Sequence, residues 1–169
     1  QVLIDAMNEI NLPNLSYINI GGYSAWKKII DSPDQNTTRE KIINEVKASG
    51  LRGRGGAGFP TGKKWSFMPN TGKQQYIVCN SDESEPGTCH DREILQRNPH
   101  ALIEGMAIAG FAINATVGYN YVRGEFMEDC YLQIKKSLEE AYEYGFLGKN
   151  ILNSNINFDF FIYQVIMRK

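Results

Sequence analysis

Short apolar runs and longer stretches of helical spacing alternate along the second half of this sequence. The short runs contain β-branched and aromatic residues, as strands do, and cover 76–79, 117–123 and 158–163. Apolar residues at helical spacing cover 38–49, 99–114 and 128–144. Strands that alternate with helices predict an α/β fold with a mainly parallel sheet.

Local residue chemistry predicts where two of these helices begin or end. Thr37 and Glu40 have the spacing of a capping box, in which each side chain satisfies a backbone N–H at the start of a helix. Gly50 suits the left-handed position just after that helix. Asn98 and Pro99 combine a capping side chain with a ring preset for the first helical turn.

The first 36 residues show a much weaker pattern than the rest. Pro13 and the Gly21-Gly22 pair indicate turns, and one short helix is expected over 24–30. We therefore expect residues 1–36 to form an N-terminal extension of the α/β domain.

Composition places the chain among ordinary globular proteins and excludes several kinds of partner. Of its 169 residues, 42% are hydrophobic and 22% are charged, and the net charge is -1. No broad positive field is available to hold nucleic acid or an anionic membrane. The longest apolar stretch, 105–119, is too short to cross a bilayer core of roughly 30 Å. We therefore predict no nucleic-acid binding and no direct membrane insertion.

Cysteine and histidine usage predicts no metal site within this segment. The three cysteines, Cys79, Cys89 and Cys130, are widely spaced, and the two histidines form no ligand array with them. A structural zinc site or an iron–sulfur cluster needs several such side chains to converge on one centre.

A glycine-rich segment that follows the first helix is the first candidate for ligand binding. Gly53, Gly55 and Gly58 match GxGxxG, a pattern that lets backbone N–H groups approach a phosphate. The segment follows a helix, whereas the dinucleotide fingerprint follows a strand, and Ala57 and Lys64 break the P-loop pattern. An arginine–glycine RNA site conflicts with the near-neutral charge. An anion site is the preferred interpretation, and a purely structural loop is the alternative.

Acidic and aromatic side chains supply two further candidates. The segment 80–88 follows a predicted strand and carries three carboxylates with several hydroxyl groups, which suit sugar hydroxyls or a cation. A solvated acidic turn explains that segment equally well. Phe59, Trp65 and Phe67 could stack on adenine or nicotinamide or could pack in the core, and for Trp65 we prefer the core.

Taken together, these motifs resemble one family. The segments LRGRGGAGFPTGKKWSFMP and CNSDESEPGT, with 99–110, 121–126 and 145–150, resemble in order and spacing the flavin-binding, NADH-oxidising subunit of respiratory complex I (NADH:quinone oxidoreductase). The same block occurs in the diaphorase subunits of NAD-linked hydrogenases and formate dehydrogenases. The resemblance implies a variant Rossmann-like FMN-binding domain, truncated here and covering residues 37–163.

The resemblance also implies ligand contacts. FMN would be bound by the glycine loop, a lysine after it and the acidic segment, namely Gly53, Arg54, Gly55, Gly56, Lys64, Asn80, Asp82, Glu83 and Ser84. Phe59 and Phe67 would flank the adenine of NADH, and Glu85 would lie beside its nicotinamide. Hydride passes from NADH to FMN in this family, and no residue of the chain is expected to act as a catalytic acid or base.

The end of the sequence departs from the family. After the third predicted strand the family supplies further flavin contacts and the cysteine motif of a [4Fe–4S] cluster, whereas residues 164–169 form a divergent tail. We therefore expect an N-terminal fragment without the cluster ligands. Expected partners are the other peripheral-arm subunits, above all the small [2Fe–2S] subunit, on the cytoplasmic or mitochondrial-matrix side of the respiratory membrane. A diaphorase subunit and a non-catalytic remnant remain alternatives.

Overall fold

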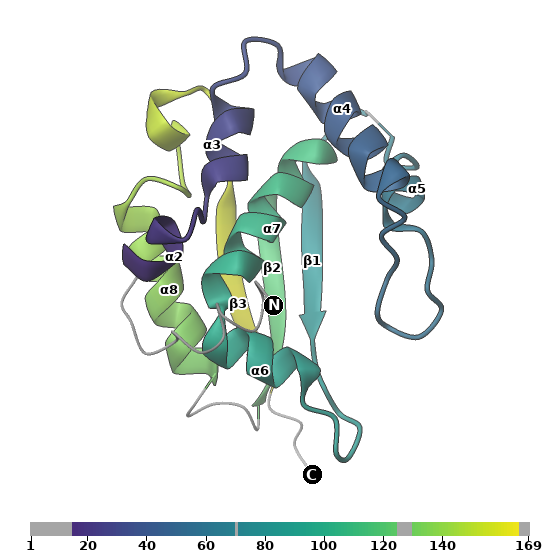
Figure 1. Cartoon of the computed structure of the whole chain (residues 1–169), viewed down its shortest axis with the longest axis vertical. Coiled ribbons are helices and arrows are strands. Elements are labelled where there is room, and N and C mark those ends of the chain that lie inside the picture. The colour runs from purple at the N-terminus through teal and green to yellow at the C-terminus, as the bar shows by residue number, and fades with distance from the viewer. Residues whose placement is uncertain (1–14, 70, 125–129, 166–169) are drawn as a thin grey trace.

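Three parallel strands form the sheet of the computed structural model, which describes residues 15–69, 71–124 and 130–165. The strands β1 (Gln75–Ser81), β2 (Ala115–Arg123) and β3 (Asp159–Val165) lie in the order β1-β2-β3 (Figure 1). Ser81 pairs with Val122, and Val122 pairs with Gln164, so the three carboxyl ends meet at one edge. This arrangement confirms the predicted α/β fold with a parallel sheet.

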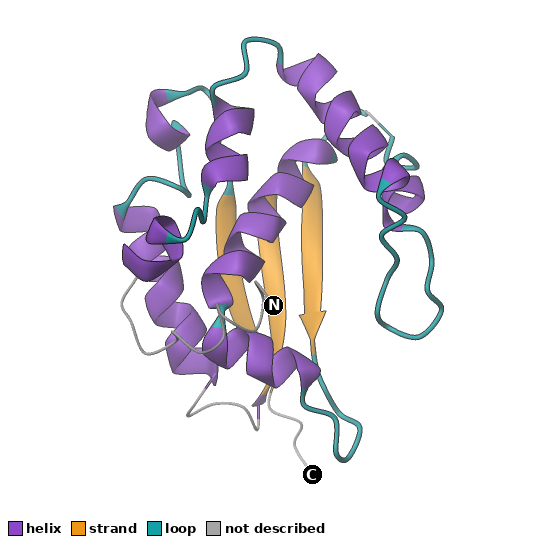
Figure 2. Cartoon of the chain, viewed as in Figure 1, coloured by secondary structure: helices purple, strands orange, loops and turns teal. Residues whose placement is uncertain are grey.

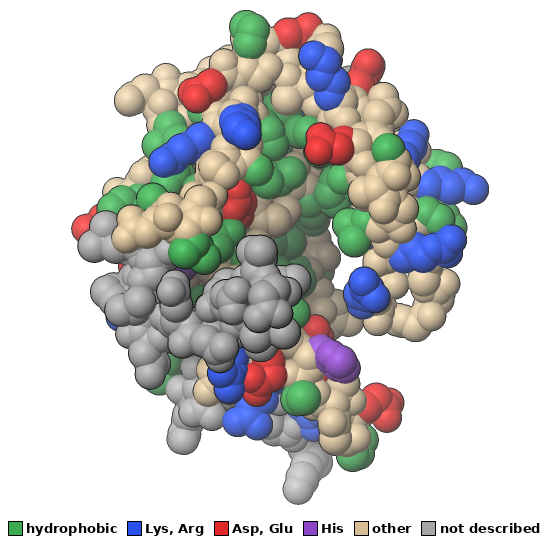
Figure 3. Space-filling view, in the orientation of Figure 1, with side chains coloured by type: hydrophobic (Ala, Val, Ile, Leu, Met, Phe, Trp, Pro, Cys, Tyr) green, Lys and Arg blue, Asp and Glu red, His purple; other side chains and the backbone are tan. Residues whose placement is uncertain are grey.

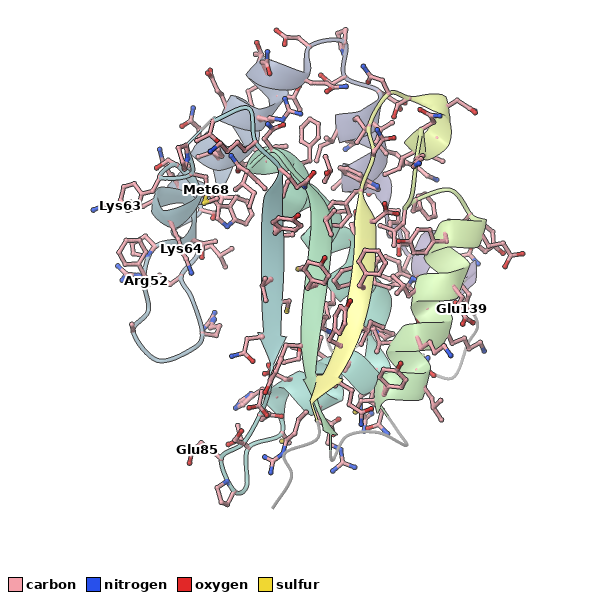
Figure 4. The ribbon with its side chains drawn as sticks, turned by 180° about the vertical axis from the view of Figure 1, so that it is seen from behind. Arg52, Lys63, Lys64, Met68, Glu85 and Glu139 are labelled. Atoms are coloured by element: carbon pink, nitrogen blue, oxygen red, sulfur yellow. The ribbon has the colours of Figure 1, made fainter. Side chains whose placement is uncertain are left out.

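Helices cover one face of this sheet. The helices α6 (His90–Arg97) and α7 (Pro99–Ala112) connect β1 to β2, and α8 (Leu132–Glu143) precedes β3. Figure 2 shows α7 lying across the strands, and the view from behind in Figure 4 shows the three strands with no described helix over them. The core lies between α7 and the sheet, where Ile103, Phe158 and Phe160 are buried.

The opposite face of the sheet is exposed and aromatic. Val78 is 65% exposed and Tyr163 is 58% exposed, and both point away from the helices because side chains alternate along a strand. The ring of Tyr119 stacks with those of Tyr76 and Phe161, at centroid distances of 6.0 Å and 5.7 Å. Parallel sheets usually have both faces covered, and helices of the described residues cover only one face here.

The N-terminal helices pack against the rest of the domain, and the second of them contributes buried residues to the core. They are α2 (Leu15–Asn19), α3 (Ser24–Ile30) and α4 (Gln35–Ala48), and α3 confirms the short helix expected over 24–30. Tyr23 and Trp26 are fully buried, and Trp26 Nε1 donates to the carbonyl of Phe146 at 2.9 Å. Residues 17–30 are therefore integral to the packing of the domain, while residues 1–14 lie outside the described part of the chain.

Two of the predicted helix boundaries are confirmed and one is wrong. Gly50 has a φ of +69°, and the side chain of Asn98 accepts from Ala101 N, as predicted. The cap of α4 is Asp34, however, whose carboxylate accepts from the N–H groups of residues 36 and 37. The helix therefore begins before the predicted capping box of Thr37 and Glu40. The helix α6 and the short 3-10 helix η3 (Ile151–Asn153) were not predicted.

Candidate functional site

The glycine-rich segment forms a projecting loop between α4 and the short helix α5 (Thr61–Trp65). Backbone hydrogen bonds close its neck, because Gly53 N donates to Phe59 O and Thr61 N donates to Leu51 O, each at 2.9 Å. Arg52 and Pro60 form an antiparallel bridge at the same place. Residues 54–58 therefore extend away from the body of the protein (Figure 1).

The tip of this loop is open. Residues 53–57 are exposed, and a Cβ added at Gly55, Gly56 or Gly58 would meet no atom within 4 Å. Gly56 and Gly58 have φ values of +109° and +59°, which side chains rarely adopt. The glycines thus leave room for a ligand to approach the backbone, since no protein group fills that space. This geometry fits the predicted phosphate contact.

Basic side chains surround the loop. Figure 4 shows Arg52, Lys63 and Lys64 grouped around the glycine loop and α5. Arg52 Nη1 donates to the carbonyl of Gly58 at 3.0 Å, so this side chain braces the loop. Lys63 and Lys64 are exposed on α5, which is held close to α4 because Gly62 lies against the backbone of Lys47. Sequence reasoning did not identify the bracing role of Arg52.

The acidic segment forms a compact turn beyond the carboxyl end of β1. Asn80 Oδ1 accepts from the backbone N–H of Asp82 at 2.9 Å, and Ser84 Oγ donates to Asp82 Oδ2 at 2.9 Å. Asn80 and Ser84 are exposed and Asp82 is half-buried. Three of the predicted flavin ligands are therefore brought together, and their remaining oxygen atoms can contact hydroxyl groups.

Glu83 is oriented differently from its neighbours. It is 7% exposed, and its carboxylate accepts from Asp91 N at 3.1 Å and Arg92 N at 3.2 Å, in the first turn of α6. Arg123 Nη1 donates to the backbone carbonyl of Glu83 at 2.7 Å. Burial raises the pKa of Asp91, and the charge of Glu83 raises it further. The structure thus places the Glu83 carboxylate against the protein backbone.

Both loops lie on the β1 side of the sheet. The glycine loop runs beside β1 and the acidic turn lies beyond the carboxyl end of that strand (Figure 1). The space-filling view in Figure 3 shows the surface hollowed between the glycine loop and the body of the protein, with basic side chains on the side of the loop. Glu85, exposed at the outer end of the acidic turn, lies far from the lysines in Figure 4.

The predicted stacking residues are exposed beside the glycine loop. Phe59 is 44% exposed and Phe67 is 62% exposed, and their ring centroids are 6.2 Å apart. Trp65, for which core packing was preferred, is half-buried. Two neighbouring exposed rings suit a planar heterocycle, since large apolar side chains otherwise tend to be buried.

The described residues contain neither a membrane-spanning helix nor a cluster of metal-binding side chains. No helix among them is long and apolar enough to cross a membrane. Within the same residues, no group of three or more His, Cys, Asp or Glu side chains could hold a metal ion.

Comparison with known proteins places these features in context. The family model described as the Nuo51 FMN-binding domain matches residues 46–164. An NADH-quinone oxidoreductase subunit of Rhizobium meliloti is 58% identical over 127 residues, which are 74% of this chain and 28% of that protein. The mitochondrial NADH-ubiquinone oxidoreductase 51 kDa subunit of Neurospora crassa is 52% identical over 128 residues, or 73% of this chain and 26% of that protein.

A solved structure shows a similar fold. The chain is similar to part of an NAD+-reducing [NiFe]-hydrogenase in its air-oxidized state, with a TM-score of 0.61 and 28% identity. The similarity covers 92% of this chain and 25% of that one. In each of these comparisons the chain spans less than a third of the length of the matched protein.

Proposed function

This chain belongs to the Nuo51 FMN-binding domain family, and on that premise we propose that it binds FMN and NADH within the NADH-oxidising flavoprotein subunit of an NADH:quinone oxidoreductase. The open glycine loop with its basic side chains, on the same side of the sheet as the acidic turn, is the observation that carries this proposal. The part of this chain that matches the Rhizobium meliloti subunit covers 28% of that protein, so this chain would supply one part of the site.

The glycine loop suits the FMN phosphate. Gly53, Gly55 and Gly56 would allow backbone N–H groups to approach the phosphate oxygens closely, and a Cβ built at Gly55 or Gly56 would meet no protein atom within 4 Å. Arg54 and Lys64 would add positive charge next to the loop. Because both side chains are exposed, they can move toward a bound anion at little cost in packing.

The acidic turn suits the ribityl chain. Asn80, Asp82 and Ser84 carry oxygen atoms that can accept hydrogen bonds from hydroxyl groups, and they are held together by their own hydrogen bonds. A preformed turn loses little conformational freedom when it binds a ligand. For Glu83, which similarity assigns to the same site, the structure shows contacts to α6.

NADH would be positioned by aromatic and acidic side chains. Phe59 and Phe67 would contact adenine, and Glu85 would lie on the nicotinamide side. Bound FMN would supply the hydride-accepting chemistry, while the side chains of this chain orient the two ligands and set the charge around them. None of these roles needs a catalytic acid or base.

The remaining partners lie outside this chain. We propose that the [4Fe–4S] cluster ligands belong to the part of the subunit that this chain does not span. The small [2Fe–2S] subunit and other peripheral-arm subunits would then hold the assembly at the cytoplasmic or matrix side of the respiratory membrane.

A diaphorase role is the second candidate. The similarity to the NAD+-reducing hydrogenase favours it, whereas the much higher identity to NADH-quinone oxidoreductase sequences favours the quinone-linked enzyme. The two differ in what receives the electrons. Oxidation of NADH by the native assembly should depend on quinone in the first case and should couple to hydrogen or formate in the second.

The proposal is tested by titrating the chain with FMN and following the quenching of flavin fluorescence. We expect saturable one-to-one binding that weakens at least about tenfold in Lys64→Ala and Asp82→Ala, since each loses a charged contact. Lys149→Ala removes an exposed lysine from the connection between α8 and η3 and should bind like the wild type. The proposal would be contradicted if FMN fluorescence were not quenched at concentrations up to about 1 mM, because the dissociation constant would then lie above that value.

A further inference from the structure

The Glu83 side chain and the Arg123 guanidinium join three separate elements at the carboxyl end of the sheet. The carboxylate of Glu83 accepts from two consecutive N–H groups of α6, at 3.1 Å and 3.2 Å. Its backbone carbonyl accepts from Arg123, the last residue of β2, at 2.7 Å. Glu83 therefore contacts α6 through its side chain and β2 through its backbone.

Helix geometry explains the side-chain contacts. The first N–H groups of any helix lack partners within the helix, and a carboxylate satisfies them and also interacts favourably with the positive end of the helix dipole. Cys89, the residue at the cap position of α6, makes no side-chain capping bond. Glu83 therefore supplies from a distant loop the capping group that the local sequence of α6 lacks.

The sheet register explains the backbone contact. Ser81 pairs with Val122 in the parallel register of β1 and β2, so Arg123 leaves β2 where the chain leaves β1 toward Glu83. A long side chain at Arg123 can reach the turn from there, and Arg123 also makes interactions beyond this one. The acidic turn is thus held to the sheet by Arg123 and to α6 by the Glu83 carboxylate.

We propose that Glu83 and Arg123 are positioning residues that hold the acidic turn in its binding conformation, and that the Glu83 carboxylate acts on α6 and makes no contact with the flavin. The proposal rests on the proposed function, because the turn it positions carries Asp82 and Ser84. A carboxylate that is 7% exposed and has both oxygen atoms turned toward amides of α6 is poorly accessible to a ligand in the hollow outside.

The first test needs no flavin. Hydrogen exchange at the amides of Asp91 and Arg92 should accelerate in Glu83→Ala, because both lose their acceptor. Glu83→Gln keeps one carbonyl acceptor and should restore part of the protection. Glu139→Ala removes an exposed glutamate of α8, remote from this turn in Figure 4, and should change neither amide. Unchanged exchange in Glu83→Ala would overturn the capping role.

The second test uses FMN titration of the same proteins. Glu83→Ala and Arg123→Met should each weaken binding about tenfold, the size of one charge-assisted hydrogen bond, and Arg123→Lys should recover part of the loss. The double variant should lose less than the product of the single losses, because both residues hold one turn. If the wild type binds FMN and both single variants bind it with the same affinity, the positioning role is wrong.

These outcomes separate the two proposals. If the wild-type chain binds no FMN, the proposed function fails and the positioning role fails with it, while the exchange experiment still decides whether Glu83 caps α6. If the wild type binds FMN and Glu83→Gln binds it as poorly as Glu83→Ala despite recovered amide protection, the carboxylate contacts the flavin and the positioning role is wrong.

Discussion

The hydroxyl of Tyr17 donates a hydrogen bond of 2.6 Å to Glu104 Oε2, across 87 positions of sequence. The same carboxylate accepts from the backbone N–H groups of Tyr23 at 2.9 Å and Trp26 at 3.3 Å. Glu104 belongs to α7 and is only 9% exposed. One buried carboxylate therefore fastens α2 and α3 to α7.

Replacing that carboxylate should destabilise the protein strongly. Glu104→Ala leaves two buried amides and a phenol without their acceptor, so we expect the free energy of unfolding in urea to fall by about 3 kcal/mol. Tyr17→Phe removes only one of the three bonds and should cost about 1 kcal/mol. A fall of less than about 0.5 kcal/mol in Glu104→Ala, as for an ordinary surface change, would contradict this role of Glu104.

A histidine in the same region should make stability depend on pH. His100 Nε2 lies 3.1 Å from Glu140 Oε2, and Nδ1 lies 2.9 Å from the Tyr23 hydroxyl. Burial lowers the pKa of His100, and the charge of Glu140 opposes this effect only in part. Near pH 7 the lowered pKa keeps the imidazole neutral, and because a carboxylate only accepts hydrogen bonds, we infer that Nε2–H donates to Glu140 and Nδ1 accepts from Tyr23.

The sign of the pH effect follows from linkage. The unfolded chain binds a proton on His100 more readily than the folded chain, so stability should fall as the pH drops below the ordinary value of 6.5 toward the lower native pKa. Urea midpoints measured between about pH 7.5 and 5 should show this slope, and His100→Gln should flatten it. If stability depended on pH equally in the wild type and in His100→Gln, His100 would not be the cause of the pH dependence.

Two glycines of the candidate site should respond to substitution in opposite ways. A Cβ at Gly62 would lie 2.5 Å from Lys47 N, so Gly62→Ala should force α5 away from α4 and cost about 1–3 kcal/mol of stability. A Cβ at Gly55 meets nothing within 4 Å, so Gly55→Ala should fold normally and weaken only FMN binding. Thermal denaturation and FMN titration of both variants distinguish these roles, and destabilisation of Gly55→Ala would contradict the open loop.

The sequence predicted those helices and strands that depend mainly on residues close together in the chain. The Asn98-Pro99 start of α7 and the apolar run of β1 depend on neighbouring residues, and both are confirmed. The helix α6 escaped prediction because Leu95 is its only buried residue and because its cap comes from Glu83 in a loop. The role of Glu83 likewise depends on the register of β1 and β2, which no local pattern contains.

The two faces of the sheet should tolerate the same substitution differently. Val78 is 65% exposed on the uncovered face, so Val78→Thr should change stability by no more than about 0.5 kcal/mol. Val122 is fully buried under the helices, and Val122→Thr places a hydroxyl there, which should cost about 1–3 kcal/mol. Chemical denaturation measures both, and equal costs would show that the two faces are equally covered.

The central claim is that the glycine loop and the acidic turn bind the same FMN molecule. It is tested most directly by adding FMN to the isotopically labelled chain and recording amide chemical shifts. The amides of residues 54–58 and 80–85 should shift together with one dissociation constant, while those of α8 remain in place. The claim would be contradicted if only one of the two loops showed chemical-shift changes, or if neither did.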